Sequence, residues 1–313
     1  MSGRAGRAMR GRCGAVALLL AAALAAGGCG LGAGKGSGDI RATVTDDFGH
    51  RQVGKASAAQ APGSETVMRF LQRHFRVQTR YGGRFVHAVN GLAGSSVGAQ
   101  VDWFYYVNGI EAGVGAADTR LHPGDRVWWD RHEWSAAMRI PAVVGSFPEP
   151  FRSGTGGKRL PVRIECTQVG GPACTTARDR LEAAGVPDAA VAATGGTAGP
   201  DVLRVVVGPW RLVRADPALQ QLQRGPSASG VYVRPSANGA SIALLNGSGR
   251  PTAVLGSGAG LVAATRLGDQ QPTWAVTGVD AAGALAAARA LDPSALHDRF
   301  AAAVSGGSVR SIP

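Results

Sequence analysis

The strongest constraint on the fold is a pair of aromatic segments, Val101–Val107 and Arg126–Asp130. Each predicts a β-strand, because aromatic and β-branched side chains fit the pleated surface of a sheet. The first segment ends at Asn108-Gly109, a pair that readily adopts the positive φ angles of a tight hairpin turn. The second follows Gly124-Asp125, which predicts another tight turn. Alternate side chains of the first strand, beginning with Trp103, are expected to fill a core.

The residues before these strands predict the rest of a small α+β domain. Apolar and polar residues alternate through 40–45, which indicates a strand, and Asp46–Gly49 suits a turn. Apolar residues then recur at helical spacing after Ser64, which we take as the helix N-cap. A further strand is expected near Arg84–Val89. This order of elements predicts an α+β domain over residues 39–140.

The two aromatic segments also carry a family resemblance. The run Trp103-Phe104-Tyr105-Tyr106-Val107-Asn108-Gly109, followed by Gly124-Asp125-Arg126-Val127-Trp128-Trp129, resembles the transcobalamin-like C-terminal domain family. The resemblance covers about 90 residues. It implies a β-grasp-like fold, which in the vertebrate cobalamin carriers closes over the bound corrinoid from one side.

Cobalamin binding does not follow automatically, because the helical barrel that completes the site in those carriers is absent from this sequence. The interface between two domains would have to supply the missing wall. Aromatic residues expected to be exposed could then stack on a planar ligand. The resemblance therefore gives these candidate ligand-binding residues: Tyr106, Asn108, Trp129 and Trp134.

The second part of the chain has a different pattern. Residues 141–159 hold prolines, glycines and serines, which predict a linker, and its Phe147 and Phe151 predict that it packs against a domain. Residues 160–313 predict an α/β domain with a mixed sheet, of no family that we can name. Asp280 is expected to cap an alanine-rich helix. The strands expected in this domain are Val162–Cys166, Val202–Val207, Gly230–Arg234, Ser241–Leu245, Gly260–Arg266 and Trp274–Thr277, and the other helices are Ala173–Ala184 and Pro217–Gln223.

The first residues of the chain predict export. Four arginines precede the apolar run Gly14–Ala26, which ends at Gly27-Gly28-Cys29. About 13 apolar residues at about 1.5 Å each cannot cross roughly 30 Å of hydrocarbon. We therefore predict a signal peptide over residues 1–28.

Two small residues before a cysteine resemble the processing site of bacterial lipoproteins. The resemblance implies cleavage before Cys29, lipidation of its thiol and attachment to the outer face of the cytoplasmic membrane. Residues 30–38 would be a flexible glycine tether. The alternative is simple secretion after cleavage near Ala23-Leu24-Ala25. Arginine-dominated basic residues and frequent Ala and Gly suggest a GC-rich, actinobacterial source.

Charge and cysteines narrow the possible partners. Removing residues 1–28 leaves 29 basic and 21 acidic residues, a difference of +8, without a basic block of the kind that binds nucleic acid. Attraction to anionic lipid or wall polymer is the simpler interpretation. Outside the cytoplasm, Cys166 and Cys174 are expected to form a disulfide.

No catalytic or metal site is predicted. Gly94–Gly98 matches a nucleophile elbow only formally, because it lies between two expected strands. His122 and His132, which lie near acidic residues, lack the spacing of a metal site and are expected to be surface residues. An enzyme would instead need carboxylates and a histidine to converge in the second domain, from this set: Glu165, Asp201, Asp280 and His297.

These features favour a non-enzymatic lipoprotein that binds a ligand at the cell envelope, with a corrinoid such as cobalamin as the first candidate ligand. The sequence defines no cofactor. One alternative is an interaction module for an envelope protein or wall polymer. A third hypothesis is an enzyme with its active site in the C-terminal domain. A ligand carrier needs a concave pocket between the domains, whereas an interaction module does not.

Overall fold

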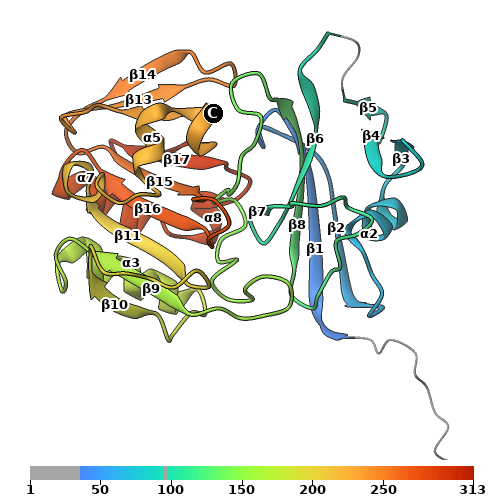
Figure 1. Ribbon diagram of the computed structural model, residues 1–313, viewed down its shortest axis with the longest axis horizontal. Helices are drawn as coiled ribbons and strands as arrows, with labels where there is room; N and C mark the ends of the chain where they lie inside the picture. Colours follow the sequence, from blue (N-terminus) through green and yellow to red (C-terminus); the bar gives the residue numbers. More distant parts are fainter. Residues whose placement is uncertain (1–35, 95–97) are drawn as a thin grey trace, which may run out of the picture. The chain divides into compact units, whose positions relative to one another are not determined.

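The computed structural model describes residues 36–94 and 98–313. The predicted signal peptide and Cys29 lie outside the described residues, as do residues 30–35 of the tether and residues 95–97 of the glycine-rich loop. The described residues form a mixed α/β structure of many strands and few, short helices, arranged in four sheets (Figure 1). None of the described helices is long and apolar enough to span a membrane.

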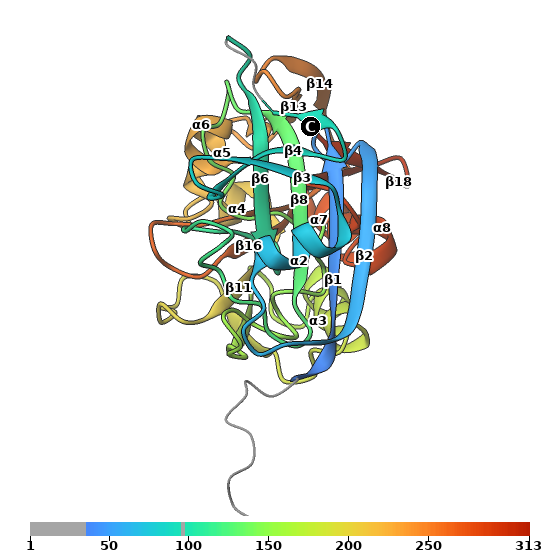
Figure 2. The ribbon, with the colours of Figure 1, turned by 90° about the vertical axis from the view of Figure 1, so that its right-hand side faces the viewer.

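The aromatic segments lie in a five-stranded sheet with the order β2-β1-β8-β6-β7. Its strands β1 and β8 are parallel, and the other neighbours are antiparallel. Helix α2 and the small sheet β3-β4-β5 lie on one side of this sheet, as Figure 2 shows. The bounds are β1 Gly36–Asp46, β2 Arg51–Ala61, α2 Val67–His74, β3 Val77–Arg80, β4 Phe85–Val89, β5 Leu92–Ala93, β6 Val101–Val107, β7 Ile110–Glu111 and β8 Arg126–Glu133.

The five-stranded sheet is buried on both faces. Alternate residues, including Val44, Trp103 and Trp129, pack in one core together with α2, as expected for Trp103. The intervening residues, including Tyr106 and Trp128, pack in a second core with side chains from the C-terminal part of the chain. The sheet therefore forms one wall of a core that the two parts share.

Residues 162–313 form a seven-stranded mixed sheet with the order β10-β9-β11-β16-β15-β17-β18. Its first four strands are parallel neighbours, and the rest pair antiparallel. A three-stranded sheet, β12-β13-β14, accompanies it. The bounds are β9 Val162–Cys166, α3 Pro172–Ala183, β10 Ala190–Ala193, β11 Leu203–Pro209, α4 Trp210–Val213, α5 Gln220–Arg224, α6 Pro226–Ser229, β12 Val233–Pro235, β13 Ile242–Leu245, β14 Pro251–Leu255, β15 Gly260–Thr265, β16 Thr273–Gly278, α7 Ala281–Arg289, α8 Pro293–Leu296, β17 Ala301–Ser305 and β18 Ser308–Ile312.

The segment 141–159 packs tightly, as its phenylalanines predict. The Phe151 side chain is fully buried, and its ring centroid lies 4.9 Å from that of Trp274 in β16. Phe147 lies 5.9 Å from the same indole, also by centroids. These contacts anchor the segment to the C-terminal sheet.

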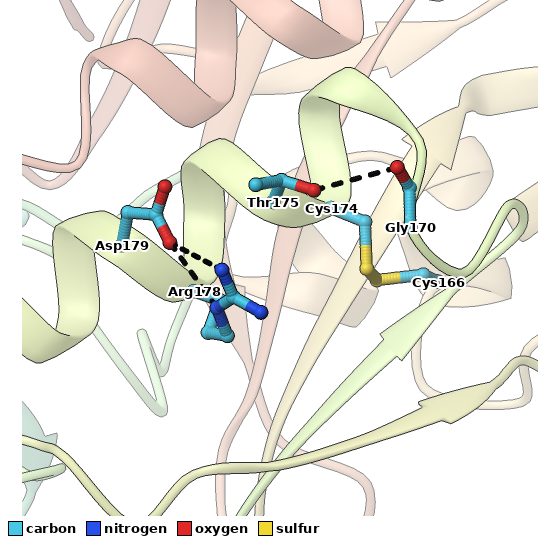
Figure 3. The surroundings of a disulfide bond; sticks show 6 residues. All are labelled: Cys166, Gly170, Cys174, Thr175, Arg178 and Asp179. Atoms are coloured by element: carbon cyan, nitrogen blue, oxygen red, sulfur yellow. Dashed lines mark hydrogen bonds and ion pairs between the residues drawn. A yellow bond between two sulfur atoms is a disulfide. The ribbon is translucent and has the colours of Figure 1, made fainter.

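The predicted disulfide is present between Cys166 and Cys174 (Figure 3). Cys166 is the last residue of β9, and Cys174 lies in the first turn of α3. The closed loop is short, so the chain-entropy model limits the stabilisation to about 3 kcal/mol. The bridge fixes the connection between a strand and its following helix.

Several sequence expectations need correction. Helix α2 begins after Thr66, whose hydroxyl accepts a hydrogen bond from the Arg69 N–H, so the predicted N-cap Ser64 is wrong. The helix expected over Pro217–Gln223 is reduced to α5, which begins at Gln220. Strand β2 was not expected, because its alanine-rich sequence has weak β propensity. Pairing with the neighbouring strand overrides that propensity. The other unexpected strands are β3, β5, β7, β10, β14, β17 and β18.

Helix α7 lies against the backbone of its sheet because glycines meet there. Asp280 caps the helix, as predicted, by accepting a hydrogen bond from the Gly283 N–H. A Cβ on Gly283 would overlap the Ala259 carbonyl oxygen and lie 2.6 Å from its carbon. A Cβ on Gly260 or Gly278 would likewise overlap the backbone of Gly283. Only glycine allows this close approach.

We therefore expect Gly283→Ala to destabilise the protein, although alanine favours a helix by about 1 kcal/mol over glycine. The overlap of the new Cβ with the Ala259 backbone should outweigh that gain. We expect a net loss of about 1–3 kcal/mol in the free energy of unfolding. Urea unfolding of the two proteins measures the difference. Gly256→Ala is the control, because a Cβ there meets nothing within 4 Å. Equal or greater stability of Gly283→Ala would contradict the packing described.

Candidate functional site

A cleft of about 910 Å³ lies at the uncovered end of the five-stranded sheet. Its floor consists of side chains from β1, β2 and β8 on the face that elsewhere packs in the shared core. Residues Gly145–Pro148, the end of α3 and the region of α8 contribute the other walls. Both parts of the chain thus line this cleft.

Strand register brings charged residues together on the floor. Arg41 of β1 lies directly beside Arg126 of β8 in the parallel pair. Thr43 follows two residues along β1 and pairs with Lys55 of β2. Because side chains alternate between the faces of a strand, Arg41 and Thr43 point to the same side. The sequence alternation that predicted the strand therefore also builds a polar, basic floor.

Two ion pairs border Arg126. Arg41 donates to Asp39 through Nε at 2.5 Å. Arg152 binds the fully buried carboxylate of Glu149, with 2.8 Å between its terminal nitrogen and Oε1. The same carboxylate accepts hydrogen bonds from the N–H and hydroxyl of Ser153. Both carboxylates are therefore already bound to other donors.

Arg126 has no such partner among the described residues. Its Nε is buried and donates no hydrogen bond. Burial lowers the pKa of the Arg126 guanidinium, and the positive charges of Arg152 and Arg41 lower it further, against the opposing effects of Glu149 and Asp39. A cation that is half-buried, unpaired and next to like charges is unfavourable unless an anion joins it.

The far side of the cleft carries a second charged group. His297 Nδ1 lies 2.8 Å from Asp298 Oδ2. Burial raises the pKa of the Asp298 carboxyl, while His297 and then Lys55 act in the opposite direction. Lys55 itself is exposed and lies on the cleft lining. This side of the cleft is thus nearly balanced in charge.

The Asn108 side chain holds the start of β8 in place. Asn108 has φ 54° in the hairpin turn, and its amide is buried. Its Nδ2 donates to Asp125 Oδ1 at 2.8 Å and to the Gly154 carbonyl at 2.9 Å, and its Oδ1 accepts from the Arg126 N–H at 2.9 Å. Burial raises the pKa of Asp125, and hydrogen bonds from His122 and Asn108 moderate that rise. The predicted ligand residue Asn108 thus has a structural position beside the cleft.

The expectation that Tyr106 and Trp129 are exposed is wrong. Tyr106 is fully buried in the shared core, and Trp129 is 2% exposed in the core below α2. The expectation failed because both faces of the sheet are covered. Trp134 is half-buried, and its indole N–H donates to Asp102 Oδ2 at 3.0 Å. None of these three residues lines the cleft.

The residues considered for an enzyme site lie apart. Glu165 forms a bidentate pair with Arg204, at 3.1 and 2.7 Å. Asp280 caps α7, His297 lines the cleft and Asp201 is exposed in a turn. Among residues 36–94 and 98–313, no three His, Cys, Asp or Glu side chains are placed to hold a metal ion.

His132 is not the surface residue that the sequence suggested. Its side chain is 1% exposed, and Nδ1 lies 2.9 Å from Asp130 Oδ1. The imidazole stacks between the rings of Phe48 and Phe104, with centroids at 4.7 and 4.4 Å. Asp130 also accepts hydrogen bonds from Thr45 and from the Phe48 and Gly49 N–H groups. This polar pair belongs to the shared core.

Sequence reasoning missed Arg126 and Lys55 as cleft residues. Arg126 was seen only as part of a turn-and-strand motif. The signal that could have found it is the alternation of Arg41 and Arg126 with apolar neighbours at two strand starts. Strand register was needed to place the two side by side.

Comparisons with known proteins concern the N-terminal part of the chain. Residues 64–133, which are 70 of 313, match the family described as "Domain of unknown function (DUF4430)". This match overlaps the segment that resembles the transcobalamin-like family. A crystal structure described as that of a "putative metal binding protein" from Ruminococcus gnavus aligns at 15% identity over 31% of this chain and 98% of that chain, with a TM-score of 0.24. No curated protein matches the chain.

We expect Asn108→Gly to destabilise the protein by about 2 kcal/mol or more, because it leaves a buried carboxylate without one of its donors. Glycine tolerates the positive φ at this position, so the loss of stability measures the contribution of the Asn108 side-chain amide alone. Chemical denaturation measures it. Asn90→Gly is the matched control: Asn90 also has positive φ, but its exposed amide accepts only from the Arg76 N–H. Equal losses in the two variants would refute the role assigned to Asn108.

Proposed function

We propose that this chain is an exported, non-enzymatic binding protein whose ligand occupies the cleft between the five-stranded sheet and the C-terminal part. The observation that supports the proposal is the cleft itself, about 910 Å³ and lined by both parts. Small-molecule sites are typically concave, lie between substructures and have volumes of this order. An unpaired arginine on the floor adds a specific point of attachment for a ligand.

The location of the protein is part of the proposal. The arginine-rich start, the short apolar run and Cys29 support export and lipidation. A lipid at Cys29 would place the described part of the chain, whose first strand is β1, at the outer face of the cytoplasmic membrane. A capture protein in this position would hold its ligand close to the bilayer.

The finer form of the proposal is a transcobalamin-like, β-grasp-like N-terminal domain with a corrinoid ligand. The motif in β6 and β8 supports it, together with a mixed sheet covered on one face by α2. The burial of Tyr106 and Trp129 removes the stacking contacts first expected. A corrinoid would therefore contact the polar floor of the cleft rather than aromatic faces.

Two other functions remain as alternatives. An interaction module would bind an envelope protein or wall polymer and would not need the cleft. An enzyme with a site in the C-terminal part gains no support from Glu165, Asp201, Asp280 and His297, which lie apart.

We expect cobalamin or cobinamide to bind the soluble chain starting at Gly30 with one-to-one stoichiometry at micromolar concentrations. Corrin absorbance and tryptophan fluorescence quenching measure the binding. Ser57→Trp, which fills part of the cleft from an exposed lining position, should weaken it at least tenfold. Ser248→Trp is the control at an exposed turn outside the cleft lining.

The absence of any spectral change up to roughly millimolar corrinoid would reject this ligand. Equal binding by the Ser57→Trp variant would place the ligand elsewhere. Only the first result would favour the interaction module over the corrinoid carrier.

A further inference from the structure

We propose that Arg126 is the centre of an oxyanion subsite in the cleft, where it binds a phosphate or carboxylate group of the ligand. The inference deepens the proposed function and rests on it, because it assumes that the cleft holds a ligand. It adds the chemical class of the group recognised and the residue that recognises it.

The local ion pairing supports this assignment. Three arginines, Arg41, Arg126 and Arg152, lie near two carboxylates, Asp39 and Glu149. Arg41 is paired with Asp39, and Arg152 with Glu149. Among the described residues, Arg126 is the arginine of this group without such a partner. A bound anion would supply that partner.

The Glu149 carboxylate cannot easily turn toward Arg126. Glu149 is fully buried, and its two oxygens accept from Arg152 and from both donors of Ser153. Moving it would break these hydrogen bonds inside the protein. Asp39 lies two residues from Arg41 on the same strand and forms an exposed ion pair with it. The free guanidinium therefore needs an external acceptor.

The chemistry of the side chain specifies an oxyanion. A guanidinium is planar, always charged at neutral pH and matches phosphate or carboxylate through two parallel hydrogen bonds. Arg126 lies beside Arg41 on the cleft floor, and Lys55 lines the same cleft from β2. The acidic residues of the lining, Asp39 and Asp298, are both paired.

A purely structural role for Arg126 predicts the opposite effect on stability. A structural arginine contributes through its partners, so its replacement destabilises the protein. The unpaired Arg126 has like charges beside it, so Arg126→Gln should leave the stability of the ligand-free protein unchanged or raise it. Loss of binding without loss of stability is the mark of a binding residue.

The test uses inorganic pyrophosphate and citrate as probes on the chain starting at Gly30, with titration calorimetry and thermal unfolding at low salt. The wild type should bind at least one probe with one-to-one stoichiometry below about 1 mM. Arg126→Gln should weaken that binding at least tenfold, and its melting temperature without probe should not fall. Arg84→Gln, at an exposed position that forms no ion pair with the described residues, should bind within twofold of the wild type.

The two probes distinguish the source of the oxyanion. Tighter pyrophosphate binding assigns a phosphate group, and tighter citrate binding assigns carboxylates. Unchanged affinity in Arg126→Gln would overturn the subsite. Failure of both probes to bind at about 10 mM, tenfold above the expected limit, would overturn it as well. Probe binding without corrinoid binding would keep the subsite and reject only the corrinoid.

Discussion

The packing of the five-stranded sheet with the C-terminal part of the chain depends on aromatic side chains of β6 and β8. Phe300, just before β17, contacts both Trp128 and Tyr106, with ring centroids at 4.9 and 5.7 Å. Phe48, in the turn after β1, contacts Phe300 and Tyr232 at 5.3 and 5.1 Å. Aromatic pairs of this kind contribute beyond the area they bury. They make the two parts share one core and so fix the walls of the cleft.

The same interface contains a polar network that limits how the parts can pack. Asp130 is fully buried, and its oxygens accept from the Thr45 hydroxyl and two backbone N–H groups and contact His132. The Trp128 indole N–H in turn donates to the Thr45 hydroxyl at 2.7 Å. A buried carboxylate is tolerated only when its acceptor sites are filled. The turn that carries Phe48 is therefore held in one position relative to β8.

Local patterns predicted the strands rich in aromatic and β-branched residues and the tight turns, but they missed β2 and several short strands. They also could not predict what covers each face of a sheet. Strand β6, the Asn108 turn and the Asp280 cap follow from short-range preferences. The exposure of Tyr106 could not be judged, because alternation shows which residues share a face but not what covers that face. Placing Arg126 in the cleft required the register between β8 and β1. In that register Arg126 lies beside Arg41, which is 85 positions earlier in the chain. Ser64 and Thr66 are both acceptable caps, and only the start of the helical hydrogen bonds distinguishes them.

Calorimetric unfolding of the chain starting at Gly30 tests the central claim, that the two parts share one core whose packing fixes the cleft. The account predicts a single transition in which the calorimetric and van't Hoff enthalpies agree, because unfolding of either part would expose the shared core of the other. Two separate transitions, with one part melting while the other stays folded, would contradict it. In that case the cleft would be a loose junction between two independent domains.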